Sequence, residues 1–299
     1  MGLPFSVVIC TRNRATALAQ VLDSIAAAEP PGVGWELVVV DNGSTDDTPA
    51  TIDKFAGRLP IRRVSEPTPG LSNARNRGVE AARGDFILWT DDDVLVRSSW
   101  LRAFAEAFAA HPDKAIFGGI VLPLYAEPRA DWFVKAEDQL RTLLAYRNFS
   151  GPISLDRMPF GACYAVRGVE QRRHRYDPEL GVAPGRRTGG EETAVLNAIF
   201  AEGGSGVWVP EGIVDHVISL ERQTLDYIFT FYRAHGRQHP DRPIAPRPAL
   251  IGGAPVRAWA ALPKRYFVYR AKRVLGRNWV GAWRDYARAV GMIDAWKGI

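Results

Sequence analysis

Three consecutive aspartates, Asp91, Asp92 and Asp93, follow the apolar run 86–90. Such a run is typical of a buried strand, and alternate residues of an extended strand point to opposite faces. We therefore expect Asp91 and Asp93 to share one face and Asp92 to lie on the other. Two carboxylates on one face can bind Mg²⁺ or Mn²⁺, which prefer oxygen ligands and substrate phosphates. A polar turn in which the aspartates cap the next helix would give the same residues, so the triplet alone leaves both interpretations open.

The elements that must position these carboxylates alternate along the first half of the chain. Short apolar runs predict strands at 5–11, 36–41, 61–64 and 86–90, and helical periodicity predicts helices at 14–28, 45–56 and 71–82. Apolar strands between helices are typical of a parallel sheet covered on both faces, where ligands bind at the carboxyl ends of the strands. Polar clusters follow three of the strands, at 11–13, 41–44 and 91–93. We predict an α/β fold with a mostly parallel central sheet flanked by helices.

The second half of the chain is less regular. Its patterns predict strands at 115–124, 158–167 and 207–218, and helices at 131–145, 192–201 and 221–234. Residues 239–263 contain six prolines, which is typical of a linker or strap. We expect two parts, an α/β domain at 1–238 and a proline-rich linker with a C-terminal helical extension at 239–299.

Composition indicates an ordinary globular protein of 299 residues, 46% of them hydrophobic and 24% charged. The two cysteines, Cys10 and Cys163, each lie in an apolar run, which favours buried, reduced thiols over a disulfide. No apolar run approaches the ~18 residues that span a bilayer, and the first residues lack a basic leader. We expect a soluble, cytoplasmic protein without a signal peptide.

The positive charge is concentrated at the C-terminus. Residues 264–299 contain nine Lys or Arg and two Asp, whereas the remainder has 29 basic and 31 acidic residues. The rest of the chain has no basic patch, so nucleic acid is a poor candidate partner. Aromatic, apolar and basic residues recur in this tail at helical spacing: Trp279, Trp283, Tyr286 and Val290, beside Arg277, Arg284 and Arg288. Such a helix suits peripheral binding to the inner face of the cell membrane, or it packs its aromatic stripe on the catalytic domain.

A series of ordered blocks over about residues 5–235 resembles the family 2 glycosyltransferases. The blocks are FSVVICTRNR (5–14), ELVVVDNGSTDDT (36–48), GLSNARNRG (70–78), GDFILWTDDD (84–93), PFGACYAVR (159–167), YDPELG (176–181) and GGEET (189–193). The resemblance implies a GT-A-like nucleotide-binding fold in residues 1–238. It also implies an inverting, Mn²⁺- or Mg²⁺-dependent transfer of a sugar from a nucleotide-diphosphate sugar to an acceptor hydroxyl. The acceptor would be a glycan or a lipid-linked molecule in cell-surface polysaccharide or glycolipid synthesis.

The resemblance also implies roles at the donor site. Thr11 and Arg12 would lie along the base and ribose, and Asp41 would accept a hydrogen bond from the base. A ring N–H is present in uracil, thymine and guanine but absent from adenine, and we favour a UDP-sugar. Arg75 would orient or neutralise the nucleotide, a role that suits a guanidinium. Structural alternatives stay open: Asp41 can form an Asx turn, and Arg75 can face solvent.

The metal and the general base come from later blocks and from the aspartate triplet. By resemblance, Asp91 would contact the ribose and Asp93 the metal, with Asp91 and His216 completing the set of metal ligands. Glu191 and Glu192 match a Glu-Asp pair at the start of a helix, whose second acid takes the acceptor proton. Acids at a helix N-terminus are also stabilised without any catalytic role.

One departure and two other functions are weighed against this interpretation. Cys163 stands where the family often has Asn, which puts any acceptor contact of that Asn in doubt. A sugar nucleotidyltransferase would more naturally carry a Gly-rich, Lys- or Arg-containing loop after the first strand. A binding-only, degenerate member acting as a scaffold is disfavoured by the intact Asp91, Asp93, Glu192 and His216.

Overall fold

The structure, a computed structural model, describes residues 4–187, 189–238 and 250–298. It consists of two compact units. Unit 1 contains Met1–Leu124, Ala145–Arg186 and Gly190–Val217, and unit 2 contains Tyr125–Leu144, Arg187–Gly189 and Ile218–Ile299. Residues 125–144 and 218–238 thus pack with the C-terminal helices, although the sequence-based division groups them with 1–238.

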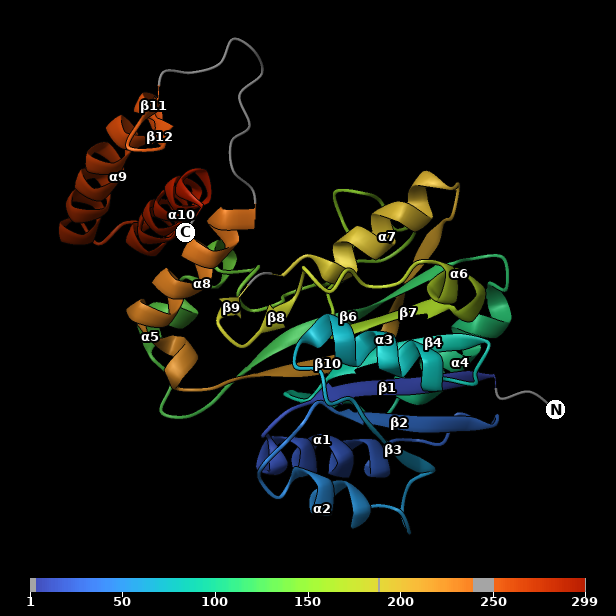
Figure 1. The fold of residues 1–299 in the computed structure, drawn as a ribbon. Helices are drawn as coiled ribbons and strands as arrows, with labels where there is room; N and C mark the ends of the chain where they lie inside the picture. The colour runs from blue at the N-terminus through green and yellow to red at the C-terminus, as the bar shows by residue number, and fades with distance from the viewer. Residues whose placement is uncertain (1–3, 188, 239–249, 299) are drawn as a thin grey trace. The chain divides into compact units, whose positions relative to one another are not determined.

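Unit 1 is built on an eight-stranded sheet with the strand order β3-β2-β1-β4-β7-β6-β10-β5 (Figure 1). The strands are β1 (Phe5–Thr11), β2 (Trp35–Asp41), β3 (Ile61–Ser65), β4 (Phe86–Asp91), β5 (Val94–Val96), β6 (Ile116–Tyr125), β7 (Cys163–Arg167) and β10 (Gly206–Ile218). The first four in spatial order run parallel, whereas β7 is antiparallel to both β4 and β6, and β10 is antiparallel to β5. The predicted α/β fold is confirmed, with its parallel half supplied by the first half of the chain.

Helices cover both faces of this sheet. They are α1 (Ala15–Ala27), α2 (Thr48–Asp53), α3 (Leu71–Ala81), α4 (Trp100–Ala110), α6 (Gly168–Arg173) and α7 (Glu191–Ala201), and two short strands, β8 (Val182–Ala183) and β9 (Arg186–Arg187), precede α7. Successive residues of β1 alternate between the two cores: Val7 and Ile9 pack with α1 and α4, and Val8 packs with α3 and α7. A strand buried on both faces reads as a continuous apolar run, which explains why these strands were predictable from the sequence.

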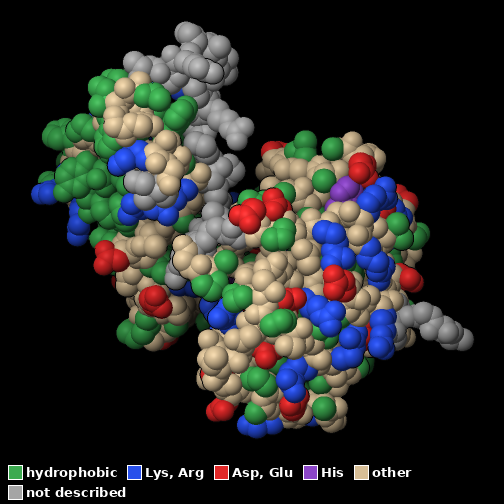
Figure 2. Space-filling model, viewed as in Figure 1, with side chains coloured by type: hydrophobic (Ala, Val, Ile, Leu, Met, Phe, Trp, Pro, Cys, Tyr) green, Lys and Arg blue, Asp and Glu red, His purple; other side chains and the backbone are tan. Residues whose placement is uncertain are grey.

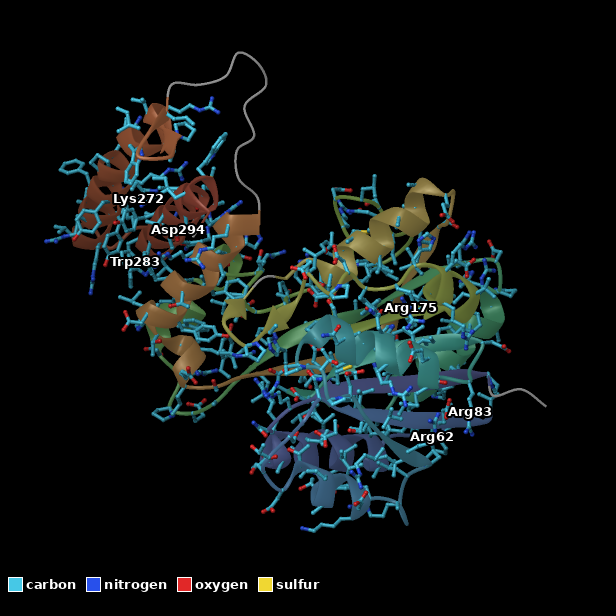
Figure 3. The ribbon with its side chains drawn as sticks, in the orientation of Figure 1. Arg62, Arg83, Arg175, Lys272, Trp283 and Asp294 are labelled. Atoms are coloured by element: carbon cyan, nitrogen blue, oxygen red, sulfur yellow. The ribbon has the colours of Figure 1, made fainter. Side chains whose placement is uncertain are left out.

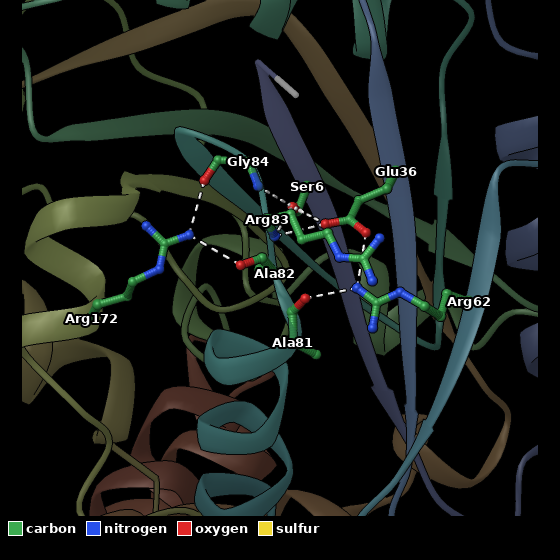
Figure 4. Close-up of polar contacts among 8 residues, drawn as sticks. All are labelled: Ser6, Glu36, Arg62, Ala81, Ala82, Arg83, Gly84 and Arg172. Carbon is green, nitrogen blue, oxygen red and sulfur yellow. Dashed lines mark hydrogen bonds and ion pairs between the residues drawn. The ribbon is translucent and has the colours of Figure 1, made fainter. Parts of the chain in front are cut away.

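A polar network fixes the amino ends of β1, β2 and β4 (Figure 4). The buried Glu36 carboxylate accepts hydrogen bonds from Ser6 Oγ at 2.7 Å, from the Arg83 N–H at 2.7 Å and from Arg62 Nη2 at 2.9 Å. Burial opposes the charge, but these donors lower the pKa of Glu36. Gly84 follows, where an added Cβ would lie 2.4 Å from the Phe5 backbone. The network therefore sets where α3 ends and β4 begins, and with them the register of Asp91 at the other end of β4.

Unit 2 is helical. It contains α5 (Asp131–Val134), α8 (Leu225–Gln238), α9 (Val256–Val274) and α10 (Trp279–Lys297), the 3₁₀ turns η1 (Glu137–Gln139) and η2 (Glu221–Gln223), and the short hairpin β11 (Leu250–Ile251) and β12 (Ala254–Pro255). Among the described residues, no helix is both long and apolar enough to cross a membrane.

The core of unit 2 is an aromatic cluster between α8, α9 and α10. The Trp283 ring of α10 packs against three aromatic rings. Its centroid lies 5.2 Å from that of Phe229, 4.7 Å from that of Tyr269 and 5.6 Å from that of Tyr286. Asp294 accepts from Arg233 at 2.6 Å and from Arg237 at 3.1 Å, which ties α10 to α8. Figure 3 labels Trp283 and Asp294 on α10. The aromatic stripe predicted in the tail therefore packs inside the helical unit.

Two element predictions in this part of the chain are wrong. The helix expected at 131–145 is broken into α5 and η1, because the Ala136 and Gln139 N–H groups bond the carbonyls three residues back, Phe133 and Ala136, in place of the α-helical spacing of four. The linker expected at 239–263 is a hairpin and then α9 from Val256 onward, while its part at 239–249 lies outside the described residues. Pro263 is tolerated within α9 because it lies on an exposed face, where water can satisfy the freed carbonyl.

The contact between α8 and α10 generates a stability prediction. A Cβ added at Gly291 would lie 1.9 Å from the Arg233 carbonyl oxygen, a backbone atom that cannot move alone. We expect Gly291→Ala to lower the free energy of unfolding by about 1–3 kcal/mol, as overpacking does. Gly57→Ala is the control, since nothing lies within 4 Å of its added Cβ. Chemical denaturation followed by circular dichroism checks both variants, and equal stabilities would contradict the close helix contact.

Candidate active site

The strand register brings the predicted donor residues to one edge of the sheet. In the parallel ladders Thr11 pairs with Asp41 and Cys10 pairs with Asp91. The ends of β2, β1 and β4 therefore lie side by side, with Asp41, Thr11 and Asp91 at the carboxyl edge. Thr11 and Asp41 are buried, whereas Arg12 is exposed. This is the edge at which ligands bind in α/β sheets.

Side-chain amides fasten the loops at this edge. The Thr45 N–H donates to Asn13 Oδ1 at 2.7 Å, which joins the loop after β1 to the loop after β2. Asn42 donates to the Glu66 and Thr68 carbonyls and accepts from the Gly70 N–H at 2.9 Å. Hydrogen bonds of Asn13 and Asn42 thereby join the loops that follow β1, β2 and β3.

Asp41 stabilises the turn after β2, since its Oδ1 accepts from the Ser44 N–H, three residues on, at 2.9 Å, where an Asx turn would bond the residue two on. The turn fixes the position of the carboxylate at the end of β2. It is compatible with the predicted contact to a nucleotide base, because a carboxylate has a second oxygen and further lone pairs.

The aspartate triplet does not keep the alternation of an extended strand. β4 ends at Asp91 and the next two residues form a turn. Arg14 Nη1 lies 3.4 Å from Asp92 Oδ1 and 3.2 Å from Asp93 Oδ2, so these two carboxylates face the same cation. The expectation that Asp92 points to the opposite face from Asp93 is therefore wrong, because the turn removes the two-residue period. Burial raises the pKa of Asp92 to about 7, against the opposing charge of Arg14.

His216 faces the triplet from β10. Its Nε2 lies 3.8 Å from Asp93 Oδ1, and both side chains are largely buried. The pairing of β10 with β5 positions the histidine, helped by a hydrogen bond from the Val217 N–H to the Asp93 carbonyl at 2.9 Å. Arg97 reinforces the same ladder through a bidentate pair with Asp215 at 2.9 and 2.8 Å.

Asp93 and His216 form a donor pair that suits a divalent cation. Carboxylate oxygen and imidazole nitrogen are ligands that Mn²⁺ accepts, and Mg²⁺ or Mn²⁺ sites are commonly completed by water and substrate phosphates. Within the described residues, no group of three or more His, Cys, Asp or Glu side chains forms a complete metal site. Asp91, the third predicted ligand, lies instead 3.7 Å from Arg75 Nη2.

Arg75 is the centre of the other half of the site. Its Nη1 lies 2.6 Å from Glu191 Oε1 and 3.8 Å from Glu192 Oε2, so one guanidinium faces the acidic end of β4 and the acidic start of α7. The Arg75 and Glu191 side chains are only 4% and 5% exposed. Burial alone would lower the Arg75 pKa, but Glu191 and its neighbours raise it well above the usual value, so the cation persists. The solvent-facing alternative for Arg75 is thereby excluded.

Glu192 lies beside this ion pair. Burial and the adjacent charge of Glu191 raise its pKa to about 7, while Arg75 opposes the shift. A carboxylate with this pKa exchanges a proton near neutral pH, as a general base must. Burial likewise raises the pKa of Asp91.

Several supporting residues were not found from the sequence. Arg14 lies in the first block, next to Arg12, but only the turn at Asp92 reveals its contact with the triplet. Tyr176 lies under Arg75, 5.5 Å from the guanidinium carbon to the ring centroid, and its hydroxyl meets that of Tyr164 at 2.5 Å. Cys163 points into the core, where it accepts from Trp100 Nε1 at 3.2 Å, so it makes no acceptor contact.

Comparison with known proteins identifies the family to which the chain belongs. Residues 6–164, more than half of the chain, match the family model for glycosyl transferase family 2. The PGL/p-HBAD biosynthesis glycosyltransferase of Mycobacterium bovis is 35% identical over 122 residues, which cover 40% of this chain and 47% of that protein. The poly(ribitol-phosphate) β-N-acetylglucosaminyltransferase TarS of Staphylococcus aureus is 29% identical over 111 residues, 36% of this chain and 19% of that protein. The matched regions thus span less than half the length of these relatives.

Solved structures share the fold. TarS 1–349 in complex with UDP-GlcNAc aligns over 81% of this chain and 68% of that one, with a TM-score of 0.54 and 16% identity. The mannosyltransferase PcManGT from Pyrobaculum calidifontis, in complex with GDP-Man and Mn²⁺, aligns over 99% of this chain and 87% of that one, with a TM-score of 0.62 and 15% identity. At these identities the likeness concerns the fold alone.

The buried ion pair generates a second prediction. Arg75→Leu leaves Glu191 buried without its cation, and we expect a loss of about 3–5 kcal/mol in the free energy of unfolding. Arg77→Leu is the matched control on the same helix, because Arg77 makes an exposed pair with Glu80 that is worth at most about 1 kcal/mol. Urea denaturation at pH 7 compares the two variants, and similar losses would show that the Arg75 pair contributes no more than a surface contact.

Proposed function

Because this chain belongs to glycosyl transferase family 2, we propose that it transfers a sugar from a nucleotide-diphosphate sugar to a hydroxyl of a glycan or lipid-linked acceptor. The observation that carries the proposal is the position of Arg75 between Asp91 of β4 and the acids of α7. Donor residues and a candidate base therefore meet around one buried cation.

The donor binds along the carboxyl edge of β2, β1 and β4. Asp41, held by the hydrogen bond from the Ser44 N–H, accepts the base N–H, and Thr11 and Arg12 flank the base and ribose. A UDP-sugar is favoured, since uracil supplies the ring N–H that Asp41 requires. Related folds are known with UDP-GlcNAc and with GDP-Man, and both bases carry such an N–H.

Asp93 and His216, with Asp91 nearby, would hold Mn²⁺ or Mg²⁺ together with the two phosphates of the donor. When bound, the ion supplies electrostatic stabilisation of the departing nucleotide diphosphate. Arg14 already pairs with Asp92 and Asp93, which shows that this end of the triplet accommodates positive charge.

Glu192 accepts the proton from the acceptor hydroxyl as its oxygen attacks the anomeric carbon. Attack from the side opposite the leaving phosphate inverts that carbon. Glu191 acts as the positioning residue, because its ion pair with Arg75 fixes the first turn of α7. The relatives named above are, by their names, a PGL/p-HBAD biosynthesis glycosyltransferase and a poly(ribitol-phosphate) β-N-acetylglucosaminyltransferase, which supports a cell-surface polysaccharide or glycolipid as the product.

Ligand stabilisation tests the donor site. We expect UDP with Mn²⁺ to raise the apparent melting temperature, and ADP with Mn²⁺ to have little effect, because adenine lacks the N–H that Asp41 accepts. A ligand at 100 times its Kd stabilises by about 2.7 kcal/mol. Chelation of the metal, or Asp93→Asn, should remove most of the shift. Differential scanning fluorimetry with UDP, GDP, TDP, CDP and ADP measures this, and no response from the folded protein would point to a binding-only scaffold.

The pH dependence of the reaction tests whether Glu192 is the general base. Glu192 acts ionised and its pKa is about 7, so kcat/KM should fall about tenfold per pH unit below 7 and level off above it. Glu192→Gln should lower kcat by about 10²–10⁴ and abolish this inflection. Glu192→Asp, which restores the family's usual acid, should retain measurable activity with a pH inflection. An unchanged inflection in Glu192→Gln would assign the titration to another group.

A further inference from the structure

Helix α9 leaves nearly all of its surface exposed. Of its 19 residues only Tyr269 is buried, where its ring packs against Trp283 of α10. Phe267 and Val274 are 73% and 86% exposed. A surface helix that packs on one side normally presents polar residues on the other, so these apolar side chains need an explanation.

The exposed apolar residues form a continuous stripe. Val256, Ala260, Pro263, Phe267 and Val274 are all exposed and recur at spacings of four, three, four and seven. Residues at this spacing share one helix face, and at about 100° per residue that face lies opposite Tyr269. The stripe is thus directed away from the core of unit 2.

Positive charge borders the stripe, since at about 100° per residue Arg257, Lys264 and Arg270 lie beside it, whereas the other basic residues of α9 lie nearer the Tyr269 side. Residues 256–278 contain no Asp or Glu and seven basic residues, all of them exposed: Arg257, Lys264, Arg265, Arg270, Lys272, Arg273 and Arg277. The two acids of the tail act elsewhere, since Asp285 pairs with Arg284 and Asp294 with Arg233 and Arg237. Figure 2 shows hydrophobic side chains beside Lys and Arg on one face of this unit, and Figure 3 labels Lys272 on α9.

We propose that the outer face of α9 lies on an anionic lipid bilayer, with Phe267 and Val274 inserted and the flanking cations at the headgroups. A bilayer offers apolar depth and a negatively charged surface along the whole helix, which is about 28 Å long at 1.5 Å per residue. An in-plane helix of this composition binds through buried apolar area and about 1 kcal/mol per basic residue. A second copy of the chain fits less well, because it would place seven cations against seven cations.

The inference does not rest on the proposed activity. Vesicle binding depends on α9, whereas the donor site depends on residues of unit 1. Nucleotide stabilisation in the same variants therefore separates a failure of one proposal from a failure of the other.

The test is co-sedimentation of the full chain with large unilamellar vesicles. We expect binding to phosphatidylcholine vesicles containing 30% phosphatidylglycerol to exceed binding to pure phosphatidylcholine at least about tenfold, and to weaken as salt rises. Lys264→Glu with Arg270→Glu should lower the partition coefficient at least about tenfold, and Phe267→Ser with Val274→Ser should lower it as well. Lys54→Glu with Arg77→Glu makes the same change in net charge on exposed residues of unit 1 and should leave binding near wild type.

Three outcomes would overturn the proposal. They are no preference of the wild-type chain for anionic vesicles, equal loss of binding in the unit 1 control, and a concentration-dependent dimer that Phe267→Ser with Val274→Ser dissociates in sedimentation velocity. The wild-type comparison of the two vesicle compositions needs no variant, so a poorly folded variant does not leave the question open.

Discussion

The structure of the site depends on one buried cation. Arg75 cannot be deprotonated, and its burial is tolerable only because Glu191 lies 2.6 Å away and Asp91 and Glu192 lie within 4 Å. Those partners come from β4 and α7, so α3 cannot adopt its position without them. The formal charge of the site remains negative, because two cations, Arg75 and Arg14, face five carboxylates, three in the aspartate triplet and two at the start of α7. Burial, and then the neighbouring carboxylates, raise the pKa values of Asp92 and Glu192 to about 7.

The precision of this cluster is set at the far end of the sheet. Glu36 gathers Ser6, Arg62 and the Arg83 N–H at the amino ends of the strands, about 20 Å of strand away from the triplet at about 3.3 Å per residue. Because side chains alternate along a strand, a slip of β4 by one residue would turn Asp91 away from Arg75. A charge network with no part in the chemistry thus decides whether the acids meet. The loops at the site, joined by Asn13 and Asn42, need only hold positions that the strands have already fixed.

What the sequence predicted followed from local patterns. Phe5–Thr11 is an apolar run and forms a strand with those bounds. The ordered blocks predicted that Asp41, Arg75, Asp91 and Glu192 belong to one site. What it missed depends on contacts between distant residues. Glu191 lies 116 residues from Arg75 along the chain, and Arg284, which donates to the Gln139 carbonyl, lies 145 residues from Gln139. The alternation of side chains expected through Asp91–Asp93 is wrong because a turn begins at Asp92. Three identical residues carry no pattern from which that turn could be predicted.

The C-terminal tail shows how one composition divides into two physical roles. From the sequence, its aromatic and basic residues were a single amphipathic signal centred on Trp279–Val290. In the structure Trp283 of α10 packs against Phe229 and Tyr269, and α10 approaches α8 so closely at Gly291 that an added Cβ would lie 1.9 Å from the Arg233 carbonyl oxygen. The acids follow the same helix, since Asp285 and Asp294 are both paired there. Packing therefore removes from α10 the features that favour a membrane and leaves them on α9, where Phe267 and Val274 are exposed and residues 256–278 contain no acid to balance their basic side chains.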